Sequence, residues 1–228
     1  MACSFNGRGN RMKGDFMSNF LLVEELESFA ILIRHAERGS IPSLTHGTDV
    51  LLTEKGKQDA QLFGSRLRDM AIGCTYSSPV PRCLQTIHSI LDGYGKSDVP
   101  VIQSTTLGAP GIYIEDSDLA GRYFLDWGTT ATVQRYIETG ELEGFKPLIS
   151  TSKAFLSQIC TDLSAFNQNL IYVSHDAVLI PFISYFNDEY FDYKKWLTFL
   201  DGAIVARGRD TVSIIRDGKK REIAGGAV

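Results

Sequence analysis

The apolar residues of this chain alternate between short unbroken runs and repeats at helical spacing. Residues 29–33 and 170–174 form two mainly apolar runs, which are typical of strands buried on both faces of a parallel sheet. Apolar positions recur three or four residues apart between 53 and 70 and again between 155 and 166, as on one face of an amphipathic helix. This alternation predicts an α/β fold.

Shorter signals complete the predicted architecture. They indicate strands at 74–77 and 99–104, a helix at 82–91 after two prolines, and strands at 203–206 and 212–215 followed by a hairpin turn at Asp217-Gly218. We therefore expect a three-layer α/β/α fold with a largely parallel central sheet and an antiparallel edge formed by the last strands.

Two segments depart from this pattern. Residues 1–24 are rich in Gly, Asn, Ser and Arg and lack a clear period, so we expect a loosely ordered leader before a single domain over residues 25–228. The pattern also weakens between about 105 and 150, and we interpret that stretch as an insertion over the functional site. Its aromatic residues could equally form a small core of their own.

Composition and charge narrow the class of protein. With 43% hydrophobic residues, 22% charged residues and a formal net charge of -4, the chain offers no overall attraction to nucleic acid or to an anionic membrane. Its apolar runs are too short to span a bilayer and its first thirty residues make a poor secretory signal, so a cytoplasmic location is the default. The four cysteines lack disulfide or metal-ligand spacing and are expected to be reduced.

Two histidines follow directly after the two apolar runs. His35 lies in the segment Arg-His-Ala-Glu-Arg of residues 34–38, and His175 precedes Asp176. Because parallel strands present their carboxyl ends at one edge of a sheet, both histidines are expected on the same rim. Arg82 falls in the first turn of the helix predicted after the two prolines.

These segments resemble the histidine phosphatase superfamily, which includes the phosphoglycerate mutases and the histidine acid phosphatases. The likeness covers about residues 29–186, and its segments follow the family's order at 34–38, 52–56, 77–86 and 172–176. It implies a phosphoglycerate mutase-like fold and a phosphohistidine intermediate on His35, without a metal ion or other cofactor. The phosphate-binding residues that it implies are Arg34, Arg38, Arg82 and His175.

The proton donor is left open between two carboxylates. Asp176 matches the His-Asp pair that supplies this donor in the acid-phosphatase-like branch, whose first motif also carries an arginine at the position of Arg38. Glu115 is the substitute, because it lies in the predicted insertion, where the mutase-like branch usually carries its acid. Either residue could instead be structural, Asp176 as a helix cap and Glu115 as a solvated loop carboxylate. No role is assigned to His46 or His88.

This set of residues suits phosphoryl transfer. A neutral imidazole can attack phosphorus and split the reaction into two displacements, provided that a hydrogen bond on its other nitrogen holds the ring in one tautomer. Guanidinium groups can stabilise the charge that spreads over the phosphoryl oxygens. We therefore expect a metal-independent phosphomonoester hydrolase that acts through His35 on a small phosphorylated substrate, whose identity the motifs do not specify.

Other functions are weighed against this one. A mutase would use the same His35 and return the phosphoryl group to a substrate hydroxyl. A non-catalytic module would keep the fold and bind a phosphate ligand without catalysing its transfer. A magnesium-dependent phosphatase is hinted at by the pair Asp116 and Asp118, but no Thr follows at the expected place. A cysteine-based phosphatase is excluded, because no cysteine is followed by an arginine at the spacing Cys-x5-Arg. The motifs do not specify the oligomeric state.

Overall fold

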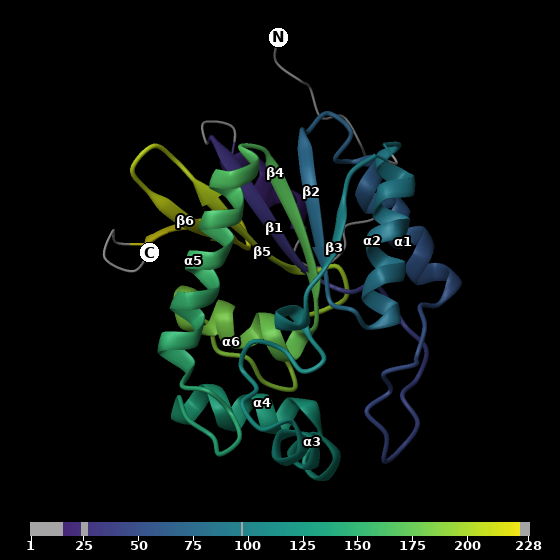
Figure 1. Cartoon of the computed structure of the whole chain (residues 1–228), viewed down its shortest axis with the longest axis vertical. Helices are drawn as coiled ribbons and strands as arrows, with labels where there is room; N and C mark the ends of the chain where they lie inside the picture. The colour runs from purple at the N-terminus through teal and green to yellow at the C-terminus, as the bar shows by residue number, and fades with distance from the viewer. Residues whose placement is uncertain (1–15, 24–26, 97, 224–228) are drawn as a thin grey trace.

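A seven-stranded sheet forms the centre of the protein in a computed structural model that describes residues 16–23, 27–96 and 98–223 (Figure 1). The strands lie in the order β3-β2-β4-β1-β5-β6-β7. Their bounds are β1 (Ser28–Arg34), β2 (Ile72–Ser77), β3 (Val101–Gln103), β4 (Asn169–Ser174), β5 (Gly202–Arg207), β6 (Val212–Arg216) and β7 (Lys219–Ile223).

The centre of the sheet is parallel and one side of it is antiparallel. β4 pairs in parallel with both β1 and β2, and β3 extends this part from β2. On the other side of β1, the strands β5, β6 and β7 are antiparallel, as predicted. Arg34 lies beside Ser174 in the register of β1 and β4, so the residues that follow these two strands come to the same rim.

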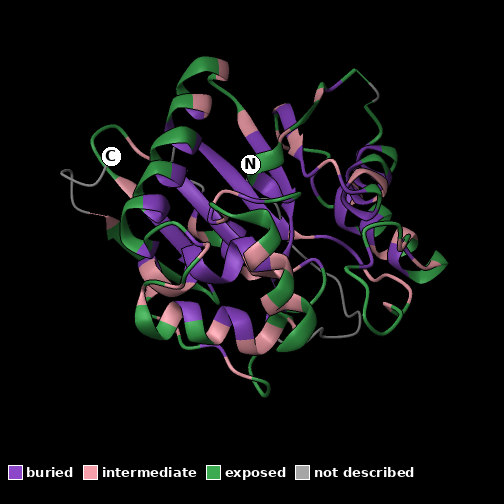
Figure 2. Cartoon of the chain, turned by 60° about the horizontal axis from the view of Figure 1, so that its bottom comes forward, coloured by how far each residue is buried: buried purple, intermediate pink, exposed green. Residues whose placement is uncertain are grey.

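Helices cover both faces of the sheet. They are η1 (Phe16–Leu22), α1 (Glu54–Ser65), α2 (Pro81–Tyr94), η2 (Thr105–Leu107), α3 (Ser117–Asp126), α4 (Gly128–Thr139), α5 (Leu148–Phe166) and α6 (Asp176–Asn187). Because side chains of a strand alternate between faces, Ile31 and Ile33 of β1 join a core with α1 and α2, while Ala30 and Leu32 join a second core with α5 and α6. Figure 2 shows the buried strands among helices whose outer sides are exposed. The predicted three-layer α/β/α fold is confirmed.

The amino-terminal segment differs from the predicted loosely ordered leader. Phe16 and Phe20 of η1 are buried, and the ring of Phe16 lies 5.8 Å from the ring of Phe63 in α1. The leader prediction is wrong for η1, because the Gly, Asn, Ser and Arg residues dominate the average composition and hide the apolar ones. Residues 1–15 and 24, which the same prediction covers, lie outside the described residues.

The stretch of residues 105–150 lies beyond the carboxyl ends of the parallel strands. Its helices α3 and α4 are at the bottom of Figure 1. The buried residues Tyr113 and Tyr136 belong to the core between the sheet and α5 and α6, and not to a separate core, whereas Trp127 is 46% exposed. Within the described ranges, no helix is long and apolar enough to cross a membrane.

Candidate active site

His35 lies directly after β1 and is 2% exposed. Its backbone N–H donates to the carbonyl of Ser174 (2.9 Å), which joins the ends of β1 and β4. Its ring nitrogen Nδ1 lies 2.8 Å from the carbonyl oxygen of Ala36. Because a carbonyl only accepts, Nδ1 carries the proton and Nε2 keeps its lone pair. The ring is therefore held in the one tautomer that a nucleophilic histidine requires.

Arg82 lies between the two histidine rings. It extends from the first turn of α2, and its Nε donates to Nε2 of His35 (3.1 Å), while its Nη2 lies 3.3 Å from Nδ1 of His175. A guanidinium group only donates, so both ring nitrogens are acceptors. Nε2 of His175 then carries the proton and lies 3.0 Å from Oγ of Ser78. Both rings are neutral in this arrangement, and both lone pairs point at one guanidinium group.

Burial explains why both rings are neutral. Burial, the neighbouring His175 and the positive charges of Arg34 and Arg82 lower the pKa of His35 well below its usual value. Burial and the charge of Arg82 lower the pKa of His175 to about 3. The neutral imidazole of His35 therefore has a free electron pair at neutral pH and needs no base to become a nucleophile.

Two further arginines bring positive charge to the rim. Arg34 forms an ion pair with Asp176, with 2.8 Å between Nη2 and Oδ2, and donates from Nη1 to the carbonyl of Leu197 (2.5 Å). Burial and the charges of Arg82 and Arg34 lower the pKa of Arg38, so the three guanidinium groups lie within electrostatic reach of one another. The amino ends of α2 and α6 also face this rim, and helix amino ends favour anions.

The two candidate proton donors have different surroundings. Oδ2 of Asp176 accepts from Arg34 and from Nε1 of Trp196 (3.0 Å), and Oδ1 accepts from the backbone N–H of Ala177. Burial raises the pKa of Asp176, but Arg34 and Trp196 outweigh burial and the pKa is lowered. Asp176 is therefore ionised in the free protein. Glu115, by contrast, is exposed and does not line the cavity that holds the other site residues.

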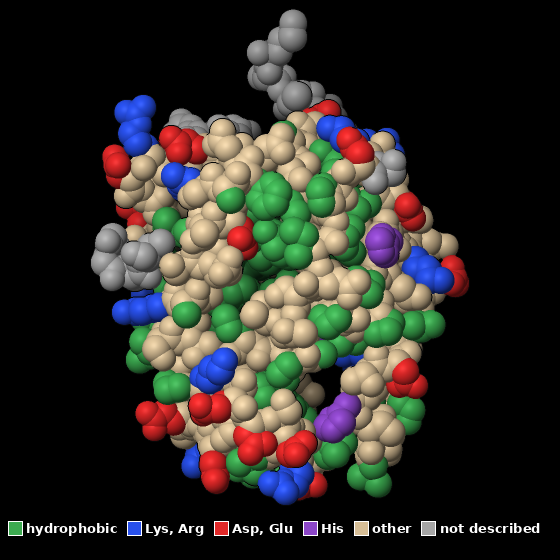
Figure 3. All heavy atoms as spheres, in the orientation of Figure 1, with side chains coloured by type: hydrophobic (Ala, Val, Ile, Leu, Met, Phe, Trp, Pro, Cys, Tyr) green, Lys and Arg blue, Asp and Glu red, His purple; other side chains and the backbone are tan. Residues whose placement is uncertain are grey.

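One cavity of about 430 Å³ joins the site residues, and Figure 3 shows the molecule hollowed between α3 and the loop of residues 39–50. The predicted residues that line it are Arg34, His35, Arg38, Arg82, His175 and Asp176. The structure thus brings together the predicted set apart from Glu115. It adds His46, which no sequence motif marked.

Gly108 supports the site in a way that the sequence did not reveal. A Cβ atom at this position would lie 2.4 Å from Cδ2 of His175, and the backbone φ is +144°, a conformation that favours glycine. Leu107 lies directly before Gly108, and its carbonyl accepts a hydrogen bond from the hydroxyl of Ser174 (2.7 Å). The turn after η2 is therefore held directly against the histidine ring, and the only available signal was a glycine in a weakly patterned segment.

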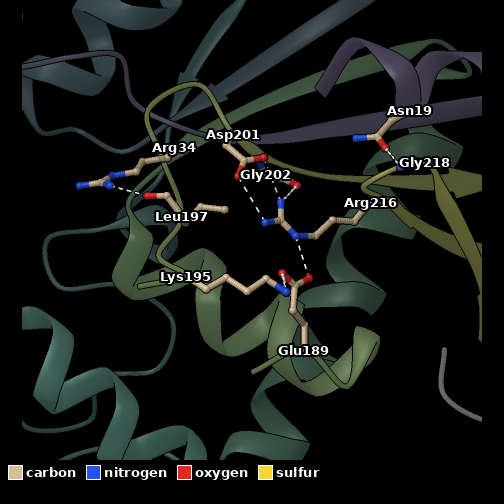
Figure 4. Close-up of polar contacts among 9 residues, drawn as sticks. All are labelled: Asn19, Arg34, Glu189, Lys195, Leu197, Asp201, Gly202, Arg216 and Gly218. Atoms are coloured by element: carbon tan, nitrogen blue, oxygen red, sulfur yellow. Dashed lines mark hydrogen bonds and ion pairs between the residues drawn. The ribbon is translucent and has the colours of Figure 1, made fainter. Parts of the chain in front are cut away.

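The loop between α6 and β5 binds both the side chain and the backbone of Arg34. Leu197 accepts from the side chain of Arg34, and the carbonyl of Asp201 accepts from its backbone N–H (2.9 Å). Figure 4 shows that the side chain of Asp201 binds Arg216 of β6, which also pairs with Glu189. Sequence reasoning missed these residues because the contacts depend on how an irregular loop folds.

The rival chemistries find little support in the side chains. Sγ of Cys83 lies 3.5 Å from Nε2 of His175, but burial raises the pKa of this thiol to about 12, so it is protonated at neutral pH. Asp116 caps α3 by accepting from the backbone N–H groups of Asp118 and Leu119. Within the part of the chain that the structure describes, no three His, Cys, Asp or Glu side chains gather as metal ligands.

Comparison with known proteins gives one family match and one sequence relative. The model of the histidine phosphatase superfamily (branch 1) matches residues 30–197. A 2,3-bisphosphoglycerate-dependent phosphoglycerate mutase 2 of Gloeobacter violaceus is 33% identical over 81 residues, which are 34% of this chain and 36% of that protein. The match therefore spans about a third of the relative.

Solved structures resemble most of the chain at low sequence identity. A phosphoglycerate mutase from Bacillus anthracis covers 87% of this chain and 93% of its own, with a TM-score of 0.53 and 15% identity. A mycobacterial glucosyl-3-phosphoglycerate phosphatase covers 78% and 89%, with a TM-score of 0.54 and 12% identity. An ecdysone phosphate phosphatase from Bombix mori covers 86% and 92%, with a TM-score of 0.52 and 15% identity. At these identities the likeness establishes a common fold.

Proposed function

Because the chain belongs to the histidine phosphatase superfamily, as its motifs predict, we propose that it is a metal-independent phosphomonoester hydrolase that acts through a phosphohistidine on His35. The observation that carries this proposal is the neutral Nε2 of His35, which lies in a cavity beside Arg34, Arg38 and Arg82. A nucleophile without charge and three fixed cations are what an incoming phosphate dianion requires.

Phosphate binding prepares the nucleophile. In the free protein, Nε of Arg82 donates to the lone pair of His35. Phosphate oxygens carry negative charge and accept more strongly than a neutral ring, so a bound phosphate draws this guanidinium group toward itself and frees Nε2. The lone pair then forms a nitrogen–phosphorus bond while the bond from phosphorus to the ester oxygen breaks. Water later cleaves the nitrogen–phosphorus bond, which restores His35 and releases phosphate.

Asp176 is the proposed proton donor to the leaving oxygen. A bound phosphate adds negative charge beside Asp176 and takes a share of the charge of Arg34, and both effects raise the pKa of the carboxyl group. The protonated carboxyl group gives its proton to the leaving alkoxide, and the resulting carboxylate accepts a proton from the attacking water. Glu115 has no comparable support, since it does not line the cavity.

A mutase reaction is the alternative for the same nucleophile. The match to a phosphoglycerate mutase supports common phosphohistidine chemistry. However, a phosphoglycerate also carries a carboxylate, which needs a cationic partner when it is removed from water. The Lys and Arg side chains that line the cavity are Arg34, Arg38 and Arg82, and these are already engaged by the phosphate. Hydrolysis is therefore the function that we favour.

The test combines turnover with trapping of the intermediate. The protein is assayed in excess chelator against a panel of phosphomonoesters, and a quenched reaction is searched by mass spectrometry for phosphate on His35. We expect hydrolysis to persist in chelator and the His35→Ala variant to lose at least about 10³-fold in kcat/KM, because removal of a nucleophile leaves only the contribution of binding. His88→Ala is the matched control, since His88 is exposed on α2, and it should retain activity.

Each other outcome selects a different function. A His35→Ala variant with unchanged turnover, or phosphate on another residue, would refute the proposal. Isomerisation of a phosphoglycerate without release of phosphate would favour the mutase. Binding of inorganic phosphate without hydrolysis of any ester and without phosphate on His35 would favour the non-catalytic module.

A further inference from the structure

The cavity has two chemically different parts. The ionisable side chains that line it are the six predicted site residues, His46 and Tyr113, whose hydroxyl pairs with that of Ser152. The rest of the lining is apolar or small and includes Ile41, Pro110, Ile114 and Phe124. The alcohol part of a substrate whose phosphate is held by the arginines therefore meets a mainly apolar wall.

Helix α3 provides much of this wall. Ser117, Ala120, Gly121 and Phe124 all line the cavity, and their spacing of three and four residues places them on one face of the helix. Three of these side chains are small and leave space, while the ring of Phe124 is only half-buried. An apolar group that covers this ring would remove hydrophobic surface from water, which favours binding.

The loop of residues 39–50 closes the opposite side. Ile41 is half-buried and packs beside Gly47, where an added Cβ would lie 2.6 Å from its Cγ1. His46 lies near α3, because a Cβ at Gly121 would be 3.5 Å from its ring. The loop is tied to the phosphate end through Gly47, whose carbonyl accepts from Nη1 of Arg82 (2.7 Å). Figure 3 shows hydrophobic side chains at the edge of this hollow.

We propose that the site selects phosphomonoesters whose alcohol part is uncharged and apolar, such as an alkyl or arylalkyl group, over phosphorylated sugars and phosphoglycerates. The inference rests on the proposed function and adds the substrate class to it. A second carboxylate or phosphate would lose its water against a wall in which His46 is the one lining side chain that could carry a positive charge, since the lining arginines are at the phosphate end. The side chains of this wall that could bind the hydroxyl groups of a sugar are those of Thr45, His46, Thr48, Ser117 and Thr129.

The test is a chain-length series whose leaving groups are chemically alike. Hydrolysis of ethyl, butyl and hexyl phosphate is compared with that of glycerol 3-phosphate and 3-phosphoglycerate. We expect kcat/KM to rise about two- to fourfold for each added methylene until the cavity is filled, and to be lowest for the two polar esters. Binding of ethyl- and hexylphosphonate is measured by calorimetry in parallel, because these analogues report on the wall without any turnover.

Matched variants locate the effect. Phe124→Ala should lower the ratio of hexyl to ethyl in both assays, and Ile41→Ala gives the same readout if the first variant fails to fold. Leu125→Ala is the control, because Leu125 is on the same helix and does not line the cavity; it should leave the ratio unchanged. The inference would be overturned if the wild type hydrolysed hexyl and ethyl phosphate with nearly equal kcat/KM, or if it preferred 3-phosphoglycerate. The proposed hydrolysis would still stand in both cases. If no ester were hydrolysed but hexylphosphonate still bound more tightly than ethylphosphonate, only the proposed function would be overturned.

Discussion

Asp176 and Glu115 can be separated by how each affects different leaving groups. Asp176→Asn removes both the proposed proton donor and the ion pair with Arg34. The loss of the ion pair affects every substrate, whereas the loss of the proton affects only substrates whose leaving group is a strong base. We therefore expect kcat/KM to fall about 10²-fold or more for ethyl phosphate and much less for 4-nitrophenyl phosphate, as measured by initial rates on both esters.

Glu115→Gln is the comparison for this prediction. Glu115 is exposed and lies outside the cavity, so the variant should keep the activity of the wild type on both esters. If Glu115→Gln produced the leaving-group dependence and Asp176→Asn reduced both activities alike, Glu115 would be the proton donor. Asp176 would then act by holding Arg34.

At the level of elements, the pair α1 and α2 determines where Arg82 is placed. A Cβ at Gly64 of α1 would lie 1.9 Å from the carbonyl oxygen of Ile90, and a Cβ at Gly93 of α2 would lie 1.9 Å from that of Gln61. Backbone atoms cannot move aside as a flexible side chain does. We expect Gly64→Ala to lower the free energy of unfolding by about 1–3 kcal/mol, as measured by urea denaturation.

An exposed position on the same helix provides the control for that variant. Gln58 is exposed in α1, so Gln58→Ala should change the free energy of unfolding by less than about 0.5 kcal/mol. Equal effects of the two substitutions would mean that the helices do not approach through their glycines as closely as the structure shows.

The elements that could be predicted are those whose signals are local. The runs in β1 and β4 predict strands because both faces of the central sheet are buried, and Thr53 marks the start of α1, where its Oγ1 accepts from the backbone N–H of Gly56 (2.9 Å). The end of α1 is less predictable. The apolar repeat continues to Met70, yet the helix ends at Ser65 and a turn follows. Leu67 and Met70 still pack on the core, but from this turn, so the apolar repeat does not mark where the helix ends.

The same distinction separates the predictable and unpredictable parts of the site. His35 and His175 could be placed together because each follows a buried parallel strand, and Arg82 because two prolines precede its helix. Trp196, Leu197 and the turn at Gly108 could not be placed, since they reach the site through irregular loops whose course depends on tertiary packing. Sequence motifs therefore identify the candidate reacting groups, while the contacts that orient them require the folded structure.

At the scale of the whole molecule, Arg216 joins the antiparallel side of the sheet to the rim that holds the candidate active site. It is 5% exposed and binds the carboxylates of Asp201 and Glu189 at 2.9 and 2.8 Å (Figure 4). Asp201 in turn accepts from the backbone N–H of Arg34. Hydrogen bonds thus link β6 to Arg34 through the carboxylate and then the backbone carbonyl of Asp201, and neither Arg216 nor Asp201 lines the cavity.

Removal of this link should affect stability and catalysis together. Arg216→Met leaves the carboxylate of Asp201 without its cation and leaves Glu189 with Lys195 (3.1 Å) as its remaining partner. Because one largely buried charge loses its compensation, we expect the free energy of unfolding to fall by about 3 kcal/mol. Because Arg34 loses part of its support, kcat/KM of the folded variant should also fall, by up to about 10²-fold. Arg221→Met on β7 is the control, since Arg221 is exposed and should change neither quantity. A destabilised Arg216→Met protein with the catalytic constants of the wild type would show that Arg216 holds the sheet together without positioning Arg34.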